Sequence, residues 1–102
     1  MKISPALIAI ASLLSISVSA ANIPEGTLAC TSELAIESVI DGYQTGNTRK
    51  INAFIGDCSV FEVPFDVDVI KWGCFSSYSS VRIYDDFGHS DWWVTTNQII
   101  VN

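Results

Sequence analysis

Three different patterns of apolar and polar residues follow one another along the chain. An apolar run covers residues 3–18, two stretches with helical spacing follow between residues 31 and 56, and strict alternation begins after residue 58. A period near 3.6 predicts a helix with one buried stripe, whereas a period of 2 predicts a strand with one buried face. The chain is therefore predicted to contain a leader, two short helices and a set of strands, in that order.

The first helix is predicted from four apolar residues that share one face. They recur at i, i+3, i+4 and i+7, the spacing of a buried helical stripe: Ile36, Val39, Ile40 and Tyr43. Thr31 or Ser32 can cap its start, and Glu33 suits the positive end of the helix dipole. Such a stripe either packs on its own domain or docks a partner, and packing is the ordinary role.

A shorter second helix is predicted from residue 47 or 48 to Ile55. Gly56 stands just past its end, where a left-handed residue commonly stops a helix. The preceding residues 21–29 contain Pro24 and Gly26 and are predicted as a loop. The helical pair thus spans residues 31–56.

Alternation after Cys58 predicts an antiparallel sheet. The first long strand has apolar residues on one face and acids on the other: Phe65, Val67 and Val69 against Asp66 and Asp68. Residues 76–80 are rich in serine and are predicted as a loop or hairpin tip, and residues 81–84 alternate again as a strand. Residues 85–91 are predicted as the connection to a last long strand that carries two tryptophans, and residues 99–101 close the sheet. Four or five short strands with turn signals between them predict a small barrel or a tight sheet.

Residues 1–20 have the features of a signal peptide. Lys2 is the one charge before Glu25, the apolar run is short for a membrane span, and residues 18–20 place small side chains where a signal peptidase reads. Removal of residues 1–20 leaves a single mature domain, residues 21–102. The chain is therefore predicted to be periplasmic or secreted, with no membrane insertion after cleavage.

The mature chain is acidic. It keeps four lysines and arginines against eleven acids, a formal charge of −7. Nucleic acid and anionic lipid are poor partners for such a chain, because both are bound through basic patches. A cationic partner suits it better, although an acidic surface also serves simply to keep an exported protein in solution.

Three cysteines lie in the exported part, where thiols are usually oxidised. Cys30 precedes the first helical pattern and Cys58 follows the second, so a disulfide between them would link the two ends of the helical segment. Cys74 is then left without a partner in the chain. It is either buried as a small hydrophobic residue or free for intermolecular pairing, so the chain is predicted to be a monomer or a weak dimer. Its apolar neighbours provide no basic group to activate it as a nucleophile.

The segment from Cys58 to Val101 resembles a bacterial SH3-like domain. The resemblance rests on an alternating strand at residues 65–69, a second at residues 81–84, and an ending that reads Trp93-Val94-Thr95-Thr96-Asn97-Gln98-Ile99. The whole mature chain is similar to small proteobacterial periplasmic proteins that join a helical hairpin to such a barrel. The resemblance implies an α+β fold, with two short N-terminal helices (31–56) packed on a small SH3-like antiparallel β-barrel (59–102).

The sequence departs from the SH3 domains that bind proline-rich peptides. Thr95 and Gln98 stand where those domains carry a proline and a tyrosine, and residues 61–64 replace their tyrosine-rich segment. Because recognition of a polyproline helix needs those aromatic walls, we do not expect that mode here. Consecutive tryptophans point to opposite faces of a strand, so one indole either lies under the helical pair or lines an exposed groove. The candidate binding aromatics are Trp72, Tyr78, Tyr84, Trp92 and Trp93.

Acidic residues form the second set of candidates. The pairs that a cationic partner would meet are Asp66 with Asp68 and Asp85 with Asp86. Asp85, Asp86, His89 and Asp91 also gather possible metal ligands, but their spacing fits no known loop, and the same residue types are typical of turns. His89 has no evident partner for general base catalysis. We therefore predict no enzyme activity, no metal and no cofactor.

Two functions remain from the sequence. In the first, the chain is an exported, non-catalytic interaction module of the bacterial cell envelope that uses its aromatic residues to bind a protein, peptide or glycan. In the second, it is a secreted acidic inhibitor or immunity-type protein that binds a cationic enzyme such as a lysozyme. Binding through charge weakens as salt rises, whereas binding through an aromatic patch does not, so salt dependence separates the two.

Overall fold

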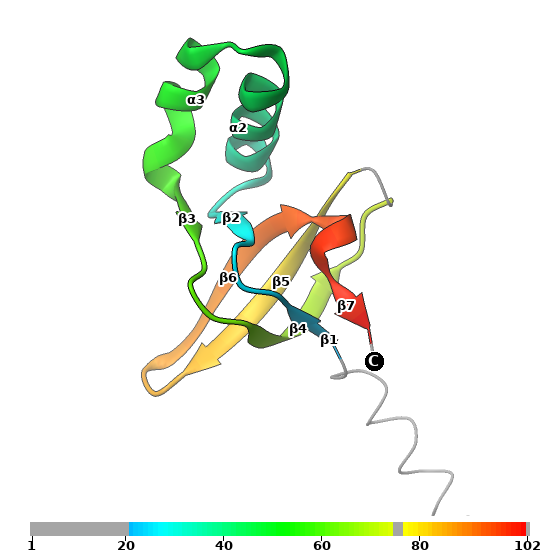
Figure 1. Ribbon diagram of the computed structural model, residues 1–102. Helices are drawn as coiled ribbons and strands as arrows, with labels where there is room; N and C mark the ends of the chain where they lie inside the picture. Colours follow the sequence, from blue (N-terminus) through cyan, green and yellow to red (C-terminus); the bar gives the residue numbers. More distant parts are fainter. Residues whose placement is uncertain (1–20, 75–76, 102) are drawn as a thin grey trace, which may run out of the picture.

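The computed structural model describes residues 21–74 and 77–101, and the predicted signal peptide lies outside them. In this part of the chain, helices α2 (Glu33–Thr45) and α3 (Thr48–Phe54) accompany a seven-stranded antiparallel sheet (Figure 1). The strands are β1 (Ala21–Ile23), β2 (Leu28–Cys30), β3 (Cys58–Val60), β4 (Phe65–Lys71), β5 (Tyr78–Asp85), β6 (Gly88–Thr95) and β7 (Ile100–Val101). The predicted α+β class is confirmed.

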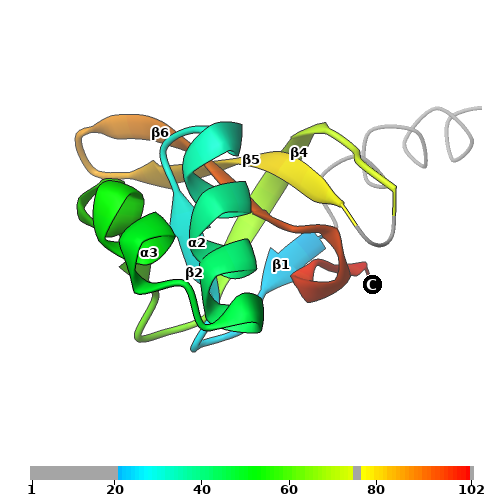
Figure 2. The ribbon, with the colours of Figure 1, turned by 90° about the horizontal axis from the view of Figure 1, so that it is seen from above.

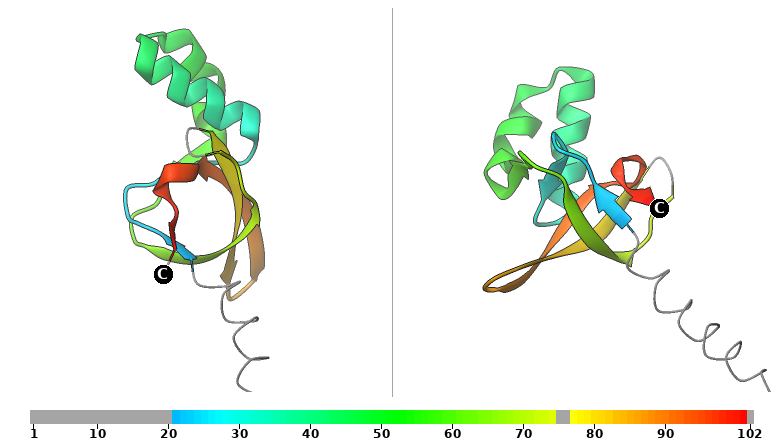
Figure 3. Two further views of the ribbon diagram at one scale, coloured as in Figure 1. Left: turned by 90° about the vertical axis from the view of Figure 1, so that its right-hand side faces the viewer. Right: turned by 60° about the horizontal axis from the view of Figure 1, so that its bottom comes forward.

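The strands follow the order β3-β2-β6-β5-β4-β1-β7. The sheet curls strongly, as Figure 3 shows, but no pairing in the described part of the chain joins its end strands β3 and β7. The pairings therefore show a curved sheet and do not show the closed barrel that was predicted.

The prediction of a loop over residues 21–29 is wrong, because both ends of this segment pair with distant residues. Ala21 to Ile23 lie opposite Val67 to Phe65 in β4, and Leu28 to Cys30 lie opposite Val60 to Cys58 in β3. Gly26 has a φ of 84° at the bend between the two strands, and its N–H donates to the carbonyl of Phe61. The local sequence indicated the bend correctly, but the pairing depends on residues that are 28 to 46 positions away.

Both helices form where the spacing predicted them. The Ser32 side chain accepts the Ala35 N–H at the start of α2, and Gly46 ends that helix with a φ of 72°. The Asn47 side chain caps α3 in the same way. Gly56 is not the left-handed stop that was predicted, since α3 runs on into a 3₁₀ turn, η1 (Ile55–Asp57), and Gly56 has no positive φ.

The last three residues of the serine-rich segment 76–80 belong to the sheet rather than to a loop, and residue 76 lies outside the described residues. Tyr78, Ser79 and Ser80 are the first residues of β5. Ser79 is fully buried, and its hydroxyl lies 2.7 Å from that of Thr96 and accepts the Gly73 N–H at 2.9 Å. A serine whose hydroxyl is satisfied in this way can be buried at little cost, so the composition signal for a loop was misleading here.

Two hydrophobic clusters lie on opposite sides of β6. The inner cluster fills the concave side of the sheet, and Trp92 packs against it. The ring centroids of Trp92 and Phe61 lie 5.4 Å apart. The second cluster lies between sheet and helices, where Cys30, Ala35 and Ile36 are fully buried and Trp93 packs against them. The two indoles thus face opposite ways, as predicted, and the helical pair covers the second.

The Cys30–Cys58 disulfide forms as predicted. The two cysteines lie directly opposite each other in β2 and β3, at the base of the helical pair. Figures 1 and 2 show the helices side by side, with the chain entering and leaving them through these two strands. The bridge therefore closes the helical segment at the point where it joins the sheet.

Candidate functional site

The β5–β6 hairpin exposes one face that the helices leave open. Even-numbered residues of β5 and odd-numbered residues of β6 share this outer side. At one end it is covered by α2 against Tyr78 and Trp93, and at the other end it projects away from the helices (Figure 1). We call this open end, with the turn and the neighbouring β4 positions, the hairpin face: Asp66, Asp68, Arg82, Tyr84, Asp85, Asp86, Phe87, His89 and Asp91.

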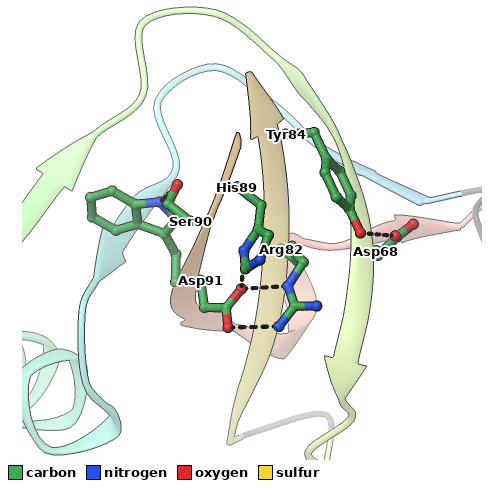
Figure 4. Close-up of polar contacts among 7 residues, drawn as sticks. Asp68, Arg82, Tyr84, His89, Ser90 and Asp91 are labelled. Carbon is green, nitrogen blue, oxygen red and sulfur yellow. Dashed lines mark hydrogen bonds and ion pairs between the residues drawn. The ribbon is translucent and has the colours of Figure 1, made fainter. Parts of the chain in front are cut away.

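A bidentate ion pair between Arg82 and Asp91 lies in the middle of the hairpin face. Arg82 and Asp91 lie directly opposite each other, and the guanidinium donates to both carboxylate oxygens, at 2.7 and 3.0 Å (Figure 4). The hydrogen bond from Arg82 lowers the pKa of Asp91 below its usual value and raises that of Arg82. The His89 Nδ1 lies 3.8 Å from the same carboxylate. The pair links the outer sides of the two strands near neutral pH.

A tyrosine links this hairpin to β4. The Tyr84 hydroxyl donates to the Asp68 carboxylate at 2.9 Å, as Figure 4 shows. This hydrogen bond, followed by desolvation and the charge of Asp68, raises the pKa of the Tyr84 phenol. On its other side the Tyr84 ring meets the His89 ring edge-on, with centroids 6.0 Å apart. Tyr84 therefore ties the hairpin to β4 on one side and contacts the second strand of the hairpin on the other.

The tip of the hairpin is a tight turn. Asp85 pairs with Gly88, so only Asp86 and Phe87 lie outside the strands, and the connection is shorter than the predicted 85–91. The Asp85 carboxylate accepts the Phe87 N–H at 2.8 Å, and Gly88 takes a φ of 133°. Aspartate at the first position and glycine at the last suit a common β-turn. Phe87 itself is 99% exposed.

The structure brings the four predicted acids to the same end of the sheet. Asp66 and Asp68 lie two positions apart on the outer side of β4, and Asp68 is opposite Arg82 in β5. Asp85 and Asp86 stand at the adjoining tip. Together with Asp91, the hairpin face holds five carboxylates against one guanidinium. The sum is a strongly negative surface around two exposed aromatic side chains.

The five predicted aromatic residues do not form one surface. Trp92 packs on the inner cluster, and its indole N–H donates to the Ser90 hydroxyl. Tyr78 and Trp93 pack against the cluster under the helices. Tyr84 belongs to the hairpin face, while Trp72, 54% exposed, follows β4 near the opposite end of β5. Only Tyr84 and Trp72 of the set are exposed, and they lie at different ends of the sheet.

Cys74 carries an exposed free thiol. It lies near Ile70 and Trp72, which are also exposed. The prediction of a buried Cys74 is therefore wrong, and the alternative of a free thiol is confirmed. Among residues 21–74 and 77–101, no group of three or more histidines, cysteines and acids is placed to hold a metal ion.

A polar pocket of about 380 Å³ lies between α2, α3 and the start of β5. Its lining residues are Glu37, Ser38, Asp41, Gln44, Lys50 and Tyr78. Lys50 and Asp41 form an ion pair across it. Burial raises the pKa of the Tyr78 phenol, and the negative charges of nearby acids raise it further. Of the charged residues that line this pocket, Asp41 and Lys50 are thus paired with each other within the chain.

Sequence reasoning missed Phe87 and the partnership of Arg82 with Asp91. An Asp-Asp-Phe-Gly turn between alternating segments does predict a hairpin, and counting outward from it places Arg82 opposite Asp91. The exposure of Phe87 then follows, because a tight turn offers no surface to cover its third residue.

Comparisons of the chain with protein-family models, with curated proteins and with solved structures gave no match. In the part of the chain that the structure describes, no helix is long and apolar enough to span a membrane. The functional argument therefore depends on the geometry of the hairpin face.

Proposed function

We propose that the mature chain is an exported, non-catalytic binding domain that recognises a cationic protein through its hairpin face. The observation that carries this proposal is the gathering of Asp66, Asp68, Asp85 and Asp86 at the open end of a braced hairpin. Complementary charge of this density speeds the encounter with a basic partner and sets its orientation. Of the two functions from the sequence, the geometry favours the secreted acidic inhibitor or immunity-type protein over the aromatic module.

Export is supported by the leader-like residues 1–20 and by the Cys30–Cys58 disulfide, since such bridges persist in oxidising compartments. The SH3-like proposal is supported by the curled antiparallel sheet and by the 3₁₀ turn η2 (Thr96–Gln98) before the last strand. We place the protein in the periplasm or outside the cell of a bacterium.

The proposal of a non-catalytic domain is supported by the fixed partners of the ionisable groups on the hairpin face. A general acid or base works best with a pKa near the operating pH. Here the pKa of Asp91 is lowered and the pKa of Tyr84 is raised, so both groups move away from neutrality. Asp91 is held by Arg82 and the Tyr84 hydroxyl is held by Asp68, contacts that suit a binding surface.

A second candidate function is the aromatic interaction module that the sequence predicts. Ile70 and Trp72, 48% and 54% exposed, form an apolar surface at the far end of β4 that suits a peptide or a glycan. Binding there would not depend on the acids of the hairpin tip.

The test is capture of proteins from a bacterial envelope extract by the mature chain at low and high salt. We expect a basic partner that is released near 0.5 M salt, where the Debye length falls to roughly 4 Å. The double variant Asp85→Asn, Asp86→Asn should lose about tenfold in association rate at low salt. Its matched control neutralises Glu33 and Glu37 on α2 and should bind normally. A partner held equally by both variants and at both salt concentrations would favour the Trp72 surface instead.

A further inference from the structure

Phe87 makes no contribution to the fold that explains its presence. Its side chain is 99% exposed, and the hydrogen bond that shapes the turn uses its backbone N–H. Neither Asp86 nor Phe87 has a positive φ, so polar residues typical of turns would fit the same backbone. A fully exposed phenyl ring is instead the side chain type that anchors an interface when a partner covers it.

The tip is narrow, and side-chain contacts brace the strands below it. Two strands about 4.8 Å apart end in a turn of two residues, and Figure 3 shows the hairpin projecting past the rest of the sheet. Below the tip, the Arg82–Asp91 ion pair and the Tyr84–Asp68 hydrogen bond fix the stem. A projecting element of this width fits a recess, and bracing of its stem lowers the conformational entropy that it loses on entering it.

The acidic residues beside Phe87 indicate which residues should line the recess in the partner. One carboxylate oxygen of Asp85 accepts the Phe87 N–H within the turn, and the other is available to a partner. The hairpin face also carries more acidic than basic residues. Buried carboxylates need basic groups to pair with them. We propose that Phe87 enters an apolar pocket in a cleft of the cationic partner, with lysine or arginine side chains around the rim to receive Asp85 and Asp86. This inference rests on the proposed function.

The consequence is that the domain occupies a concave site of its partner. A partner whose function uses that cleft would be blocked while the hairpin is bound, and a flat basic surface would bind weakly. Truncation of Phe87 should therefore cost roughly 10- to 100-fold in affinity, the range expected when one phenyl ring loses a pocket. Because Phe87 touches nothing in its own chain, the thermal midpoint should not change.

The experiment places a photo-crosslinking phenylalanine analogue at position 87 of the full mature chain and illuminates it in the envelope extract. The control carries the analogue at Tyr43, an aromatic residue of α2 with 62% exposure. We expect an adduct from position 87 that is absent at high salt, joined to a partner peptide rich in lysine or arginine, and no adduct from position 43. Phe87→Ala should weaken capture of that partner by at least tenfold with an unchanged melting curve.

The possible failures are distinguishable. A salt-sensitive basic partner that is captured equally by Phe87→Ala and does not crosslink to position 87 would overturn the insertion of Phe87 and leave the proposed function standing. The absence of any salt-sensitive basic partner would overturn both. An adduct to a peptide without basic residues would contradict the composition assigned to the cleft.

Discussion

Removal of the Cys30–Cys58 disulfide should cost the fold a large part of its stability. The cysteines are separated by 28 residues, and in the chain-entropy model a loop of this length gives about 3.6 kcal/mol. A domain of this size is stable by about 4–12 kcal/mol in total. Cys30 is also fully buried between sheet and helices, so its replacement loses packing as well. We expect Cys30→Ala with Cys58→Ala to lower the free energy of unfolding by about 3–5 kcal/mol.

The measurement is guanidinium unfolding followed by tryptophan fluorescence, because Trp93 packs in the same cluster as Cys30. Reference and variant should both carry Cys74→Ala, which removes the exposed thiol and prevents disulfide exchange. A loss below about 1 kcal/mol, with an unchanged denaturant slope, would refute the reasoning. It would mean that packing of α2 and α3 on the sheet holds the helical segment without the bridge.

The other predictions concern the helical pair and the hairpin face. Gly42→Ala should destabilise the domain by more than 1 kcal/mol despite the better helix propensity of alanine, because the new Cβ would lie 2.7 Å from the Ile51 side chain; a raised thermal midpoint would contradict this. In a carboxyl NMR titration, Asp91 should titrate below its usual pKa of 3.8, and Arg82→Gln should raise that midpoint. Since the pKa of Asp91 is lower in the folded state, its contribution to stability is present at neutral pH and is lost as the pH falls through the folded value. An Asp91 midpoint that does not respond to Arg82→Gln would show that the ion pair is absent in solution.

The sequence predicted those features that local patterning determines. The cap of α2 at Ser32 and the alternation of β4 depend on neighbours within a few residues, and both form as expected. The apolar stripe of α2 is confirmed at Ile36 and Val39, but its predicted last member, Tyr43, is 62% exposed. The disulfide was also predicted correctly, because positions before and after a helical pair are brought together when the pair folds back. Opposite orientation of Trp92 and Trp93 follows from the pleat of any strand.

What the sequence did not predict depends on distant partners. Residues 21–29 have few strand-forming signals and become strands only because β3 and β4 pair with them. Ser79 was assigned to a loop from its composition, but Thr96 and Gly73 satisfy its hydroxyl in the core. The candidate aromatics were chosen as exposed rings, and burial by the helices could not be judged without knowing which face they cover.

The central claim is that the hairpin face is the surface that binds. The most direct test is amide chemical-shift mapping on the isotope-labelled mature chain as the captured basic partner is added. We predict that the largest changes fall on residues 66–68 and 82–91, with the Phe87 amide among them. Changes centred on Trp72 and Cys74, or on the pocket beside Tyr78, with residues 82–91 unaffected, would contradict the account.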